Sequence, residues 1–221
     1  MSKPITKHFY DALYASTNAE GSLGWFHRLT HRVMEKDIAE TVATRVLELG
    51  VNRGEHISFV TQRCSHYVAT DFRLTALNES RHQAALTQAV CSAERLPFPD
   101  ESFDRVIVTC LLHHLERPLD AIRETRRVLK QGGTFSLLLP CDPGIVYRLA
   151  WRLTSQRRLK KLGVVDPKLY HSLEHTGNFV SLYSMVMHVF AEDHTNERWW
   201  PLPVRSWNLN LFSVLTVFRS T

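Results

Sequence analysis

The segment that most constrains how this chain can fold is the run VLELGVNRG at residues 46–54. Its first four residues are typical of a buried strand, and Gly50 and Gly54 then permit a tight turn before a helix-like stretch at residues 55–62. A strand, turn and helix in this order direct backbone N–H groups at a ligand and let its atoms approach the main chain closely. The segment predicts a nucleotide-like cofactor, although glycine turns also follow strands for structural reasons alone.

Strands and helices alternate regularly on both sides of this turn. Strands are expected at residues 44–49, 66–70, 86–90, 104–109 and 134–139, with helices at 55–62, 72–80 and 119–130, the last closed by Gly132 and Gly133. This alternation favours a parallel, doubly wound sheet. Two final strands at residues 198–204 and 211–219 have too short a connection for a parallel crossover, so we expect them to be antiparallel.

Helical segments precede and follow this core. Residues 7–38 are predicted to form two helices with a break at residues 18–22, a basic amphipathic helix is expected at 145–162, and one or two more at 167–191. The 221 residues are therefore interpreted as one domain. Its parts are an N-terminal helical cap (1–43), a core (44–140), a helical insertion (141–195) and a final strand pair (196–221).

The composition narrows the class of protein. Hydrophobic residues make up 44% and charged residues 22% of the chain, which is ordinary for a soluble globular protein, and no apolar run is long enough to cross a membrane. The first seven residues lack the apolar core of a signal peptide. Cys64, Cys91, Cys110 and Cys141 form no CxxC pair, so we expect a reduced cytoplasmic protein.

The net charge of +5 lies entirely in the last third of the chain. Residues 1–144 carry 17 basic and 17 acidic side chains, whereas residues 145–221 carry 10 basic and 5 acidic ones. The densest run is Arg148, Arg152, Arg157, Arg158, Lys160 and Lys161, interleaved with Trp151 and Leu153. It is either a solvated helix face or a site for a phosphate-bearing acceptor or an anionic membrane surface. Nucleic acid is not expected, because no module that reads it accompanies the charge.

Three further features follow predicted strands, at the sheet edge where ligands bind in open α/β folds. Asp71 stands some twenty residues past the glycine turn and can accept hydrogen bonds from a ribose, or it caps the next helix. Residues 92–98 can form an apolar slot with polar edges for an adenine, or an ordinary loop. The run TCLLHHL at residues 109–115 ends the fourth strand.

Taken together, these motifs resemble a known family. The order ELGxxxG, Asp71, AExLPFPDxSFDxV, LxHL and RRVLKxGG, over about residues 44–140, is similar to the small-molecule branch of the class I S-adenosylmethionine-dependent methyltransferases. The resemblance implies a Rossmann-like, doubly wound, seven-stranded sheet, mostly parallel with an antiparallel last strand. It also implies S-adenosylmethionine as cofactor, with methyl transfer to an O or N atom of a small or lipid-linked acceptor, expected to be anionic and sugar-derived.

The resemblance also implies which residues contact the cofactor. They are Glu48, Gly50, Asn52 and Gly54 at the methionine end, Asp71 and Phe72 at the ribose and adenine, Ser92, Ala93 and Glu94 at the adenine edge, and Thr109 and Cys110 beneath the methionine. Two positions depart from the family pattern. Asn52 replaces a usual glycine, which asparagine tolerates better than most residues, and Ser92 replaces an Asp with a weaker, neutral acceptor.

Histidines supply the candidate catalytic groups. His114 matches the histidine of LxHL and is predicted to act as a general base or to position the acceptor, unless it only hydrogen-bonds the backbone. The adjacent His113 is expected to point away. His171 and His175 lie four residues apart, so on a helix they share a face and can enter the acceptor pocket. No third ligand is evident beside them, so no metal site is expected.

By resemblance, the acceptor is selected outside the sheet, by residues 5–38 and 141–195. Tyr10, Tyr14, Trp25, Phe26 and His27 are aromatic candidates for closing over the cofactor, although core packing explains most such side chains. Two alternatives remain open: a quinone or phospholipid methyltransferase peripheral to the inner membrane face, and a methyltransferase-like binding protein that Asn52 has made non-catalytic.

Overall fold

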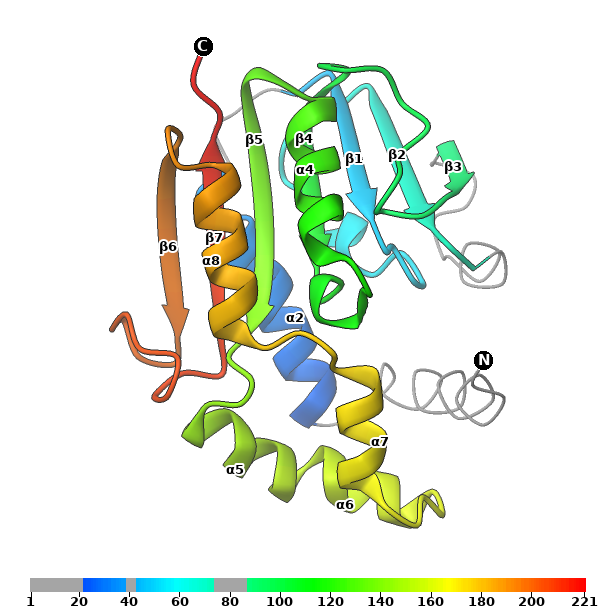
Figure 1. Cartoon of the computed structure of the whole chain (residues 1–221), viewed down its shortest axis with the longest axis vertical. Coiled ribbons are helices and arrows are strands. Elements are labelled where there is room, and N and C mark those ends of the chain that lie inside the picture. The colour runs from blue at the N-terminus through cyan, green and yellow to red at the C-terminus, as the bar shows by residue number, and fades with distance from the viewer. Residues whose placement is uncertain (1–21, 39–42, 74–86) are drawn as a thin grey trace.

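A seven-stranded mixed sheet forms the centre of the computed structural model, which describes residues 22–38, 43–73 and 87–221 (Figure 1). Its strands are β1 (Arg45–Leu49), β2 (His66–Asp71), β3 (Thr87–Val90), β4 (Phe103–Thr109), β5 (Leu129–Pro140), β6 (His194–Trp200) and β7 (Phe212–Phe218). They lie in the order β3-β2-β1-β4-β5-β7-β6. β1 to β5 are parallel, and β7 runs antiparallel to both β5 and β6. The predicted doubly wound sheet with an antiparallel last strand is confirmed.

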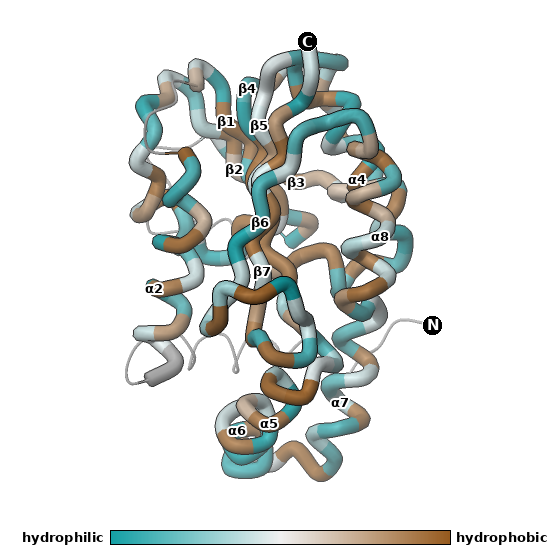
Figure 2. The backbone as a smooth tube through the Cα atoms, turned by 90° about the vertical axis from the view of Figure 1, so that its left-hand side faces the viewer, coloured by the Kyte–Doolittle hydropathy of each residue, from teal (hydrophilic) through white to brown (hydrophobic). Residues whose placement is uncertain are grey.

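Helices cover both faces of this sheet and one of its edges. The described helices are α2 (Ser22–Met34), α4 (Pro118–Val128), α5 (Ile145–Leu153), α6 (Ser155–Lys161), α7 (Pro167–Glu174) and α8 (Phe179–Val189), with short 3-10 turns η1 (His56–Phe59) and η3 (Leu112–His114). Figure 2 shows the hydrophobic strands in the middle, with α2 on one side and α4 and α8 on the other. Among the described residues, no helix is both long and apolar enough to cross a bilayer.

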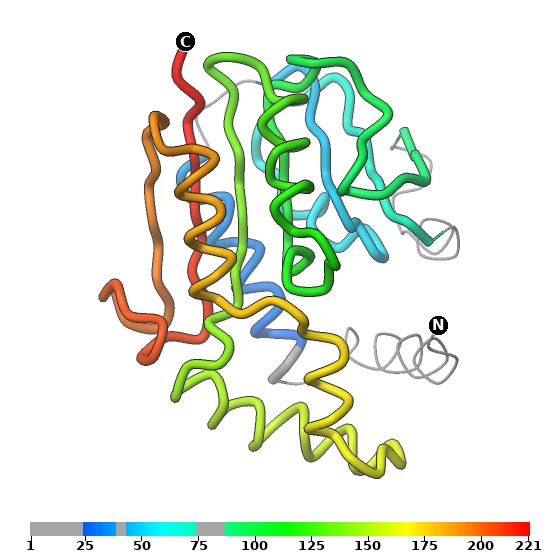
Figure 3. The backbone as a smooth tube through the Cα atoms, viewed as in Figure 1, coloured from blue at the N-terminus to red at the C-terminus, as the bar shows by residue number. Residues whose placement is uncertain are grey.

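The period-2 alternation of β4 divides the core between the two faces. Val106 and Val108 belong to the large cluster beneath α4 and α8, whereas Ile107 belongs to the cluster beneath α2. Successive strand side chains point to opposite faces, so a strand that is apolar throughout must be covered on both sides. The short helices α5, α6 and α7 lie instead beyond the carboxyl ends of the parallel strands (Figures 1 and 3). We call this group the α5–α7 cap.

Two predicted boundaries in the core are wrong. The crossover expected as a helix at residues 55–62 is only the 3-10 turn η1, after which Val60 is extended. The helix expected at residues 119–130 stops at Val128, because Leu129 already pairs with Phe103 as the first residue of β5. A Cβ on Gly133 would lie 2.8 Å from the Lys130 carbonyl oxygen, so this glycine permits a close backbone approach within the strand.

Two predicted boundaries in the last third are also wrong. The single helix expected at residues 145–162 is split into α5 and α6 at Thr154, whose φ of −114° and ψ of −84° are not helical. The strand expected at residues 198–204 ends at Trp200, because Pro201 and Pro203 lack the N–H that a ladder needs. Asn210 instead holds the following loop, accepting from the Leu202 N–H at 2.9 Å.

Parts of the prediction lie outside the described residues. These are Tyr10 and Tyr14, the first of the two helices expected before residue 38, and nearly all of the helix expected at residues 72–80. Of the other N-terminal aromatics, Phe26 packs edge-on against Phe212 at 5.7 Å, and Trp25 contacts Trp200 at 6.3 Å. Both rings therefore contact the β6–β7 pair.

Candidate active site at the carboxyl edge of the sheet

Four strands deliver the predicted site residues to one edge. Leu49 of β1 pairs with Thr70 of β2 and with Val108 of β4, and Asp71 pairs with Val90 of β3. The residues that follow these strands, at positions 50, 72, 91 and 109–110, are therefore neighbours. The glycine turn, Asp71, the loop at 92–94 and the end of β4 lie together, as expected for the carboxyl edge of a parallel sheet.

The turn after β1 uses three left-handed residues. Gly50, Asn52 and Gly54 have φ values of +68°, +47° and +73°. Asn52, which replaces a glycine of the family pattern, therefore still adopts the left-handed backbone conformation of this turn. A Cβ on Gly50 would lie 2.9 Å from Leu111 Cδ1, so the absent side chain at this position leaves room for the segment that follows β4.

Asp71 is tied to the turn. It is 5% exposed and its carboxylate accepts hydrogen bonds from the backbone N–H groups of Asn52 (3.1 Å) and Arg73 (3.0 Å). The Arg73 guanidinium lies 3.7 Å from the same carboxylate and 5.5 Å above the ring of Phe72, which is 70% exposed. The carboxylate is thus preorganised beside the turn with the geometry of an acceptor for hydroxyl groups.

The other predicted cofactor residues have varied surroundings. Glu48 is buried and accepts from the Tyr67 hydroxyl at 2.7 Å, and its burial raises its pKa. Glu94 accepts from the Arg117 N–H at 2.8 Å, while the Ser92 hydroxyl accepts from the Glu94 N–H at 3.2 Å. Both loop side chains therefore fix the loop and the start of α4.

Three further positions complete the predicted set. Ala93 packs against the main core, Thr109 ends β4, and Cys110 follows it with a φ of +51°. This left-handed residue turns the chain out of the sheet and towards η3.

His114, the predicted catalytic residue, is held by the α7 end of the cap. Its Nδ1 lies 2.8 Å from the Glu174 carbonyl oxygen, which makes Nδ1 the protonated nitrogen. Burial, followed by the neighbouring His175, lowers the pKa of His114 to about 4. The ring is therefore neutral at physiological pH.

The prediction that His113 points away is wrong. Its ring centroid lies 4.1 Å from that of His114 and 4.4 Å from that of His175. Both adjacent histidines sit in the tight η3 turn, where successive side chains are not forced to opposite sides as they are in a strand. Burial holds the pKa of His113 well below its ordinary value.

The prediction that His171 and His175 lack a third ligand-forming side chain is also wrong. His171 Nε2 and His175 Nδ1 both donate to Asp142 Oδ2, at 2.8 and 3.1 Å. Against the cost of burial, these two hydrogen bonds hold the pKa of Asp142 well below its ordinary value. Asp142 follows β5 at the same edge at which Asp71 ends β2, and an acidic residue at this edge is the signal that could have identified it.

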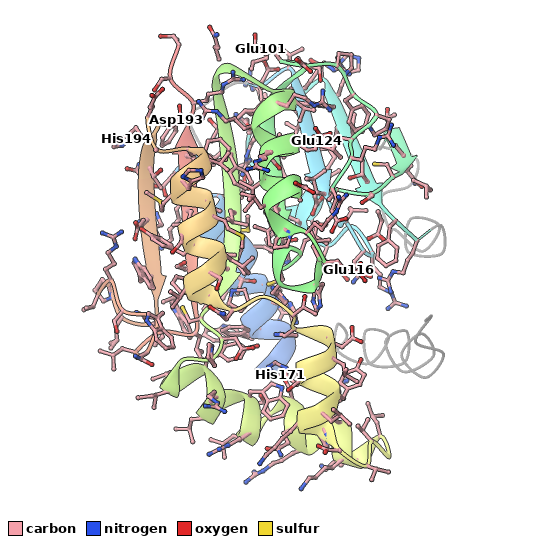
Figure 4. The ribbon with its side chains drawn as sticks, in the orientation of Figure 1. Glu101, Glu116, Glu124, His171, Asp193 and His194 are labelled. Atoms are coloured by element: carbon pink, nitrogen blue, oxygen red, sulfur yellow. The ribbon has the colours of Figure 1, made fainter. Side chains whose placement is uncertain are left out.

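A cavity of about 420 Å³ opens between α5 and α7. Its lining residues are Asp142, Pro143, Tyr147, Arg148, Trp151, Arg152, Lys168, His171, Ser172, His175, Thr176, Gly177 and Asn178. Figure 4 labels the side chain of His171, which projects from α7. The walls thus combine two aromatic rings with three cationic groups, which suits a small anionic molecule with an apolar part.

Backbone hydrogen bonds join this cavity to the sheet edge. The N–H of Thr176 donates to the carbonyl of His113 in η3 at 2.9 Å, and the N–H of Phe179 donates to the carbonyl of Asp142 at 2.8 Å. The cavity therefore lies next to the segment that follows β4, beyond Thr109 and Cys110.

Comparison with known proteins agrees with this geometry. Residues 47–137 match the model of a family described as a methyltransferase domain. The chain is 51% identical over 53 residues to the ubiquinone/menaquinone biosynthesis C-methyltransferase UbiE of Bordetella avium, covering 24% of this chain and 21% of that protein. It is 31% identical over 124 residues to a demethylmenaquinone methyltransferase of Clavibacter sepedonicus, covering 54% and 50%. The matches thus span between a fifth and a half of these relatives' lengths.

Solved structures share the whole fold. A SAM-dependent methyltransferase from Thermotoga maritima superposes with a TM-score of 0.66 at 16% identity, over 98% of this chain and 99% of that one. The sequence match covers the strands that build the edge described above, and the structural match covers the sheet and its helices. The cofactor that the family implies is S-adenosylmethionine. Residues 47–137 therefore match a methyltransferase domain, and the chain as a whole has the fold of a solved S-adenosylmethionine-dependent methyltransferase.

Proposed function

We propose that this chain transfers the methyl group of S-adenosylmethionine to a small anionic acceptor held in the cavity of the α5–α7 cap. The proposal rests on how two sites are placed. The glycine turn, Asp71 and the end of β4 share one edge of the sheet, and residues of the cavity wall are hydrogen-bonded to the segment that follows β4. Donor and acceptor sites would thus adjoin, which is the main requirement of an in-line methyl transfer.

The residues present fit the cofactor. The left-handed turn at Gly50, Asn52 and Gly54 supports close approach of a ligand to the main chain, and the Asp71 carboxylate beside it suits ribose hydroxyls. Bound S-adenosylmethionine supplies a methyl group on a positively charged sulfur, which needs no further activation. The remaining task for the protein is to hold the acceptor in line and to take up any proton it loses.

His114 is proposed as the group that takes up this proton or positions the acceptor. Its bond to the Glu174 carbonyl fixes the ring, and burial keeps it neutral above about pH 4. A neutral imidazole can accept a proton, although this low pKa makes it a weak base. The role therefore suits an acceptor that is already acidic, such as a phenol or a carboxylic acid.

The cavity walls favour an acceptor with negative charge. Arg148, Arg152 and Lys168 supply the cationic groups, and Tyr147 and Trp151 supply flat apolar surfaces. Several cationic side chains gathered at one cavity attract anions and so raise the local concentration of an anionic acceptor. Both a sugar-derived phosphate and an aromatic acid satisfy this chemistry, and a panel of acceptors separates them.

Calorimetry with S-adenosylmethionine tests the donor half of the proposal. Asp71→Ala should weaken binding at least tenfold, because two hydroxyl partners lose their charged acceptor. Asp100→Ala is the matched control, since this exposed carboxylate precedes β4 at the opposite edge. Equal affinity of wild type and Asp71→Ala, or no binding by the wild type, would refute the site.

A second candidate is quinone methylation at a membrane surface. The cap exposes Ile145, Leu149 and Leu153 at i, i+4 and i+8 on α5, next to the basic α6 helix. An apolar stripe beside basic residues is typical of a helix that lies on an anionic bilayer, and two curated relatives are named as menaquinone or ubiquinone methyltransferases.

Co-sedimentation with anionic phospholipid vesicles tests this candidate. Binding by the wild type that is lost in Leu149→Glu, but retained in Val90→Glu at the end of β3, would favour it. Val90 is 54% exposed, as Leu149 is 56%, and β3 forms the edge of the sheet opposite β6. An absence of vesicle binding at low ionic strength would remove the candidate.

A further inference from the structure

Three ligand-forming side chains converge on one wall of the α5–α7 cavity. Asp142 follows β5, while His171 and His175 come from α7 and its C-terminal end. One atom of each lies within 4.8 Å of the other two, and all three residues line the cavity. Two imidazoles and one carboxylate at an open cavity wall are a ligand set for a divalent transition metal with coordination positions left for a small molecule.

Two of the three distances within this set already match those between the ligands of one metal ion. Asp142 Oδ2 lies 2.8 Å from His171 Nε2 and 3.1 Å from His175 Nδ1. Ligands held about 2.0–2.2 Å from one ion, at angles near 90–110°, are about 2.8–3.6 Å apart. The ligand atoms of the two histidines lie within 4.8 Å of each other, so a shift of the side chains would bring all three atoms around one ion.

Packing holds each of the three residues in position. The ring of His171 lies against Trp151 of α5, with centroids 4.7 Å apart, and against His175, with centroids 4.0 Å apart. The carbonyl of Asp142 accepts from the N–H of Phe179 at 2.8 Å, which fixes the β5 end relative to α8. A site whose ligands are already oriented by neighbours binds its ion without first ordering them.

From this geometry we propose that Asp142, His171 and His175 bind a divalent first-row transition metal ion at the wall of the cavity. Imidazole nitrogens and one carboxylate suit Zn²⁺, Fe²⁺, Co²⁺ and Mn²⁺, and Zn²⁺ is the probe of choice because it tolerates four ligands without a preferred d-electron geometry. Three protein ligands leave at least one position that faces the cavity.

The surrounding charges indicate what occupies that open position. Arg148, Arg152 and Lys168 line the same cavity and disfavour a lone dication. An anionic oxygen on the ion would balance them. This part of the inference rests on the proposed function: the acceptor would bind the metal through an oxyanion, so that the ion orients it beside the methyl donor.

Metal binding is measured on the full chain, without cofactor or acceptor, so its failure is distinct from a failure of the proposed function. Isothermal titration with Zn²⁺ should show one tight site per chain. Titration with Co²⁺ should give visible absorption bands of a four- or five-coordinate ion, which Zn²⁺ then displaces. Saturating Zn²⁺ should also raise the melting temperature, because the ion binds only the folded state. A wild-type protein that binds neither ion overturns the proposal.

Substitutions identify the ligands. His171→Gln and Asp142→Asn should each weaken Zn²⁺ binding at least tenfold, the size of change expected when a group in or around a metal site is lost. His194→Gln is the control, since this exposed histidine on β6 hydrogen-bonds Asn196 and stacks on Phe218, and neither residue lines the cavity. Circular dichroism establishes that each variant is folded, and the wild-type Co²⁺ spectrum does not depend on any variant.

A competing set shares His175. His113, His114 and His175 also bring one atom each within 4.8 Å of one another. His114→Gln should leave Zn²⁺ affinity within threefold of wild type if the metal binds where we propose. If His114→Gln removes binding while His171→Gln retains it, the ion sits among these three imidazoles and the assignment to Asp142 and His171 is refuted.

Discussion

This molecule holds two groups of histidines, one buried and one half-buried, and they differ in the residues that surround their shared carboxylate. Beneath α2, His56 donates to Glu35 at 3.1 Å, and the carboxylate of Glu35 also takes a two-pronged ion pair from Arg105 at 2.7 and 3.1 Å. In the cap, Asp142 accepts hydrogen bonds from His171 and His175. It faces a cavity, whereas Glu35 faces the Arg105 guanidinium.

This difference indicates that the group around Glu35 stabilises the fold, whereas the group around Asp142 can bind a ligand. Arg105 is fully buried on β4 and also bonds the Ser136 hydroxyl, so it attaches α2 and η1 to the sheet. Its positive charge balances the Glu35 carboxylate, so Glu35 and His56 need no bound ligand to balance the charge. Within the described part of the chain, Asp142 forms no ion pair with a lysine or arginine, and it remains partly accessible. A carboxylate beside two imidazoles at a cavity wall is available to an ion or a substrate.

Removal of Arg105 is expected to have the largest effect on stability. Arg105→Met keeps the length of the side chain but leaves the Glu35 carboxylate buried without its cation. The free energy of unfolding should fall by about 3–5 kcal/mol, as for other broken buried ion pairs. Urea denaturation measures this, with Arg198→Met as the control. Arg198 pairs with Asp37 at the surface, so its loss should cost less than about 1 kcal/mol.

The second-largest effect is expected in the pH dependence of stability, through His31 and Glu35 beneath α2. Burial, followed by the nearby His56 and His27, lowers the pKa of His31 to about 3, and against burial the bonds from His56 and Arg105 lower that of Glu35 to about 2. Both folded-state values lie below the unfolded ones. The unfolded chain therefore takes up protons first, and stability is lost as the pH falls from 6.5 to about 3 for His31 and from 4.5 to about 2 for Glu35.

His31→Gln provides the measurement. Between pH 6.5 and 5 the free energy of unfolding should depend on pH less steeply in this variant, by up to about 1.4 kcal/mol per pH unit. The exposed His194→Gln should keep the wild-type slope. If His31→Gln leaves the slope unchanged, His31 is not the buried neutral group described here.

The smallest effect on stability is expected at the cap. Asp142→Asn keeps an oxygen that can accept from one of the two imidazoles, and the site is partly hydrated, so the free energy of unfolding should fall by only about 1 kcal/mol. The same variant should impair metal binding strongly. A loss of stability as large as that of Arg105→Met would show that the two groups are alike, and that Asp142 serves the fold.

Much of the cofactor edge could be predicted from the chain alone. Gly50, Asp71 and Cys110 each follow an apolar strand, and parallel strands must bring their ends to one edge, so local sequence was enough to collect them. The boundaries were harder to predict. β5 begins at Leu129 because a partner strand is present, which local propensity does not contain. β6 ends at Trp200 because Pro201 and Pro203 lack the N–H that a ladder needs, which is a signal that the sequence does carry.

The amino-acid sequence by itself determined the alternation of elements, the sheet and the positions of the cofactor edge, because periodicity and glycine placement act over short distances. Only the tertiary structure decided that His114, Asp142 and His175 lie together. They belong to three segments far apart in the chain, joined by the bonds from Thr176 and Phe179 to the carbonyls of η3 and the end of β5. Contacts between distant segments depend on how the whole chain packs, so no local pattern encodes them.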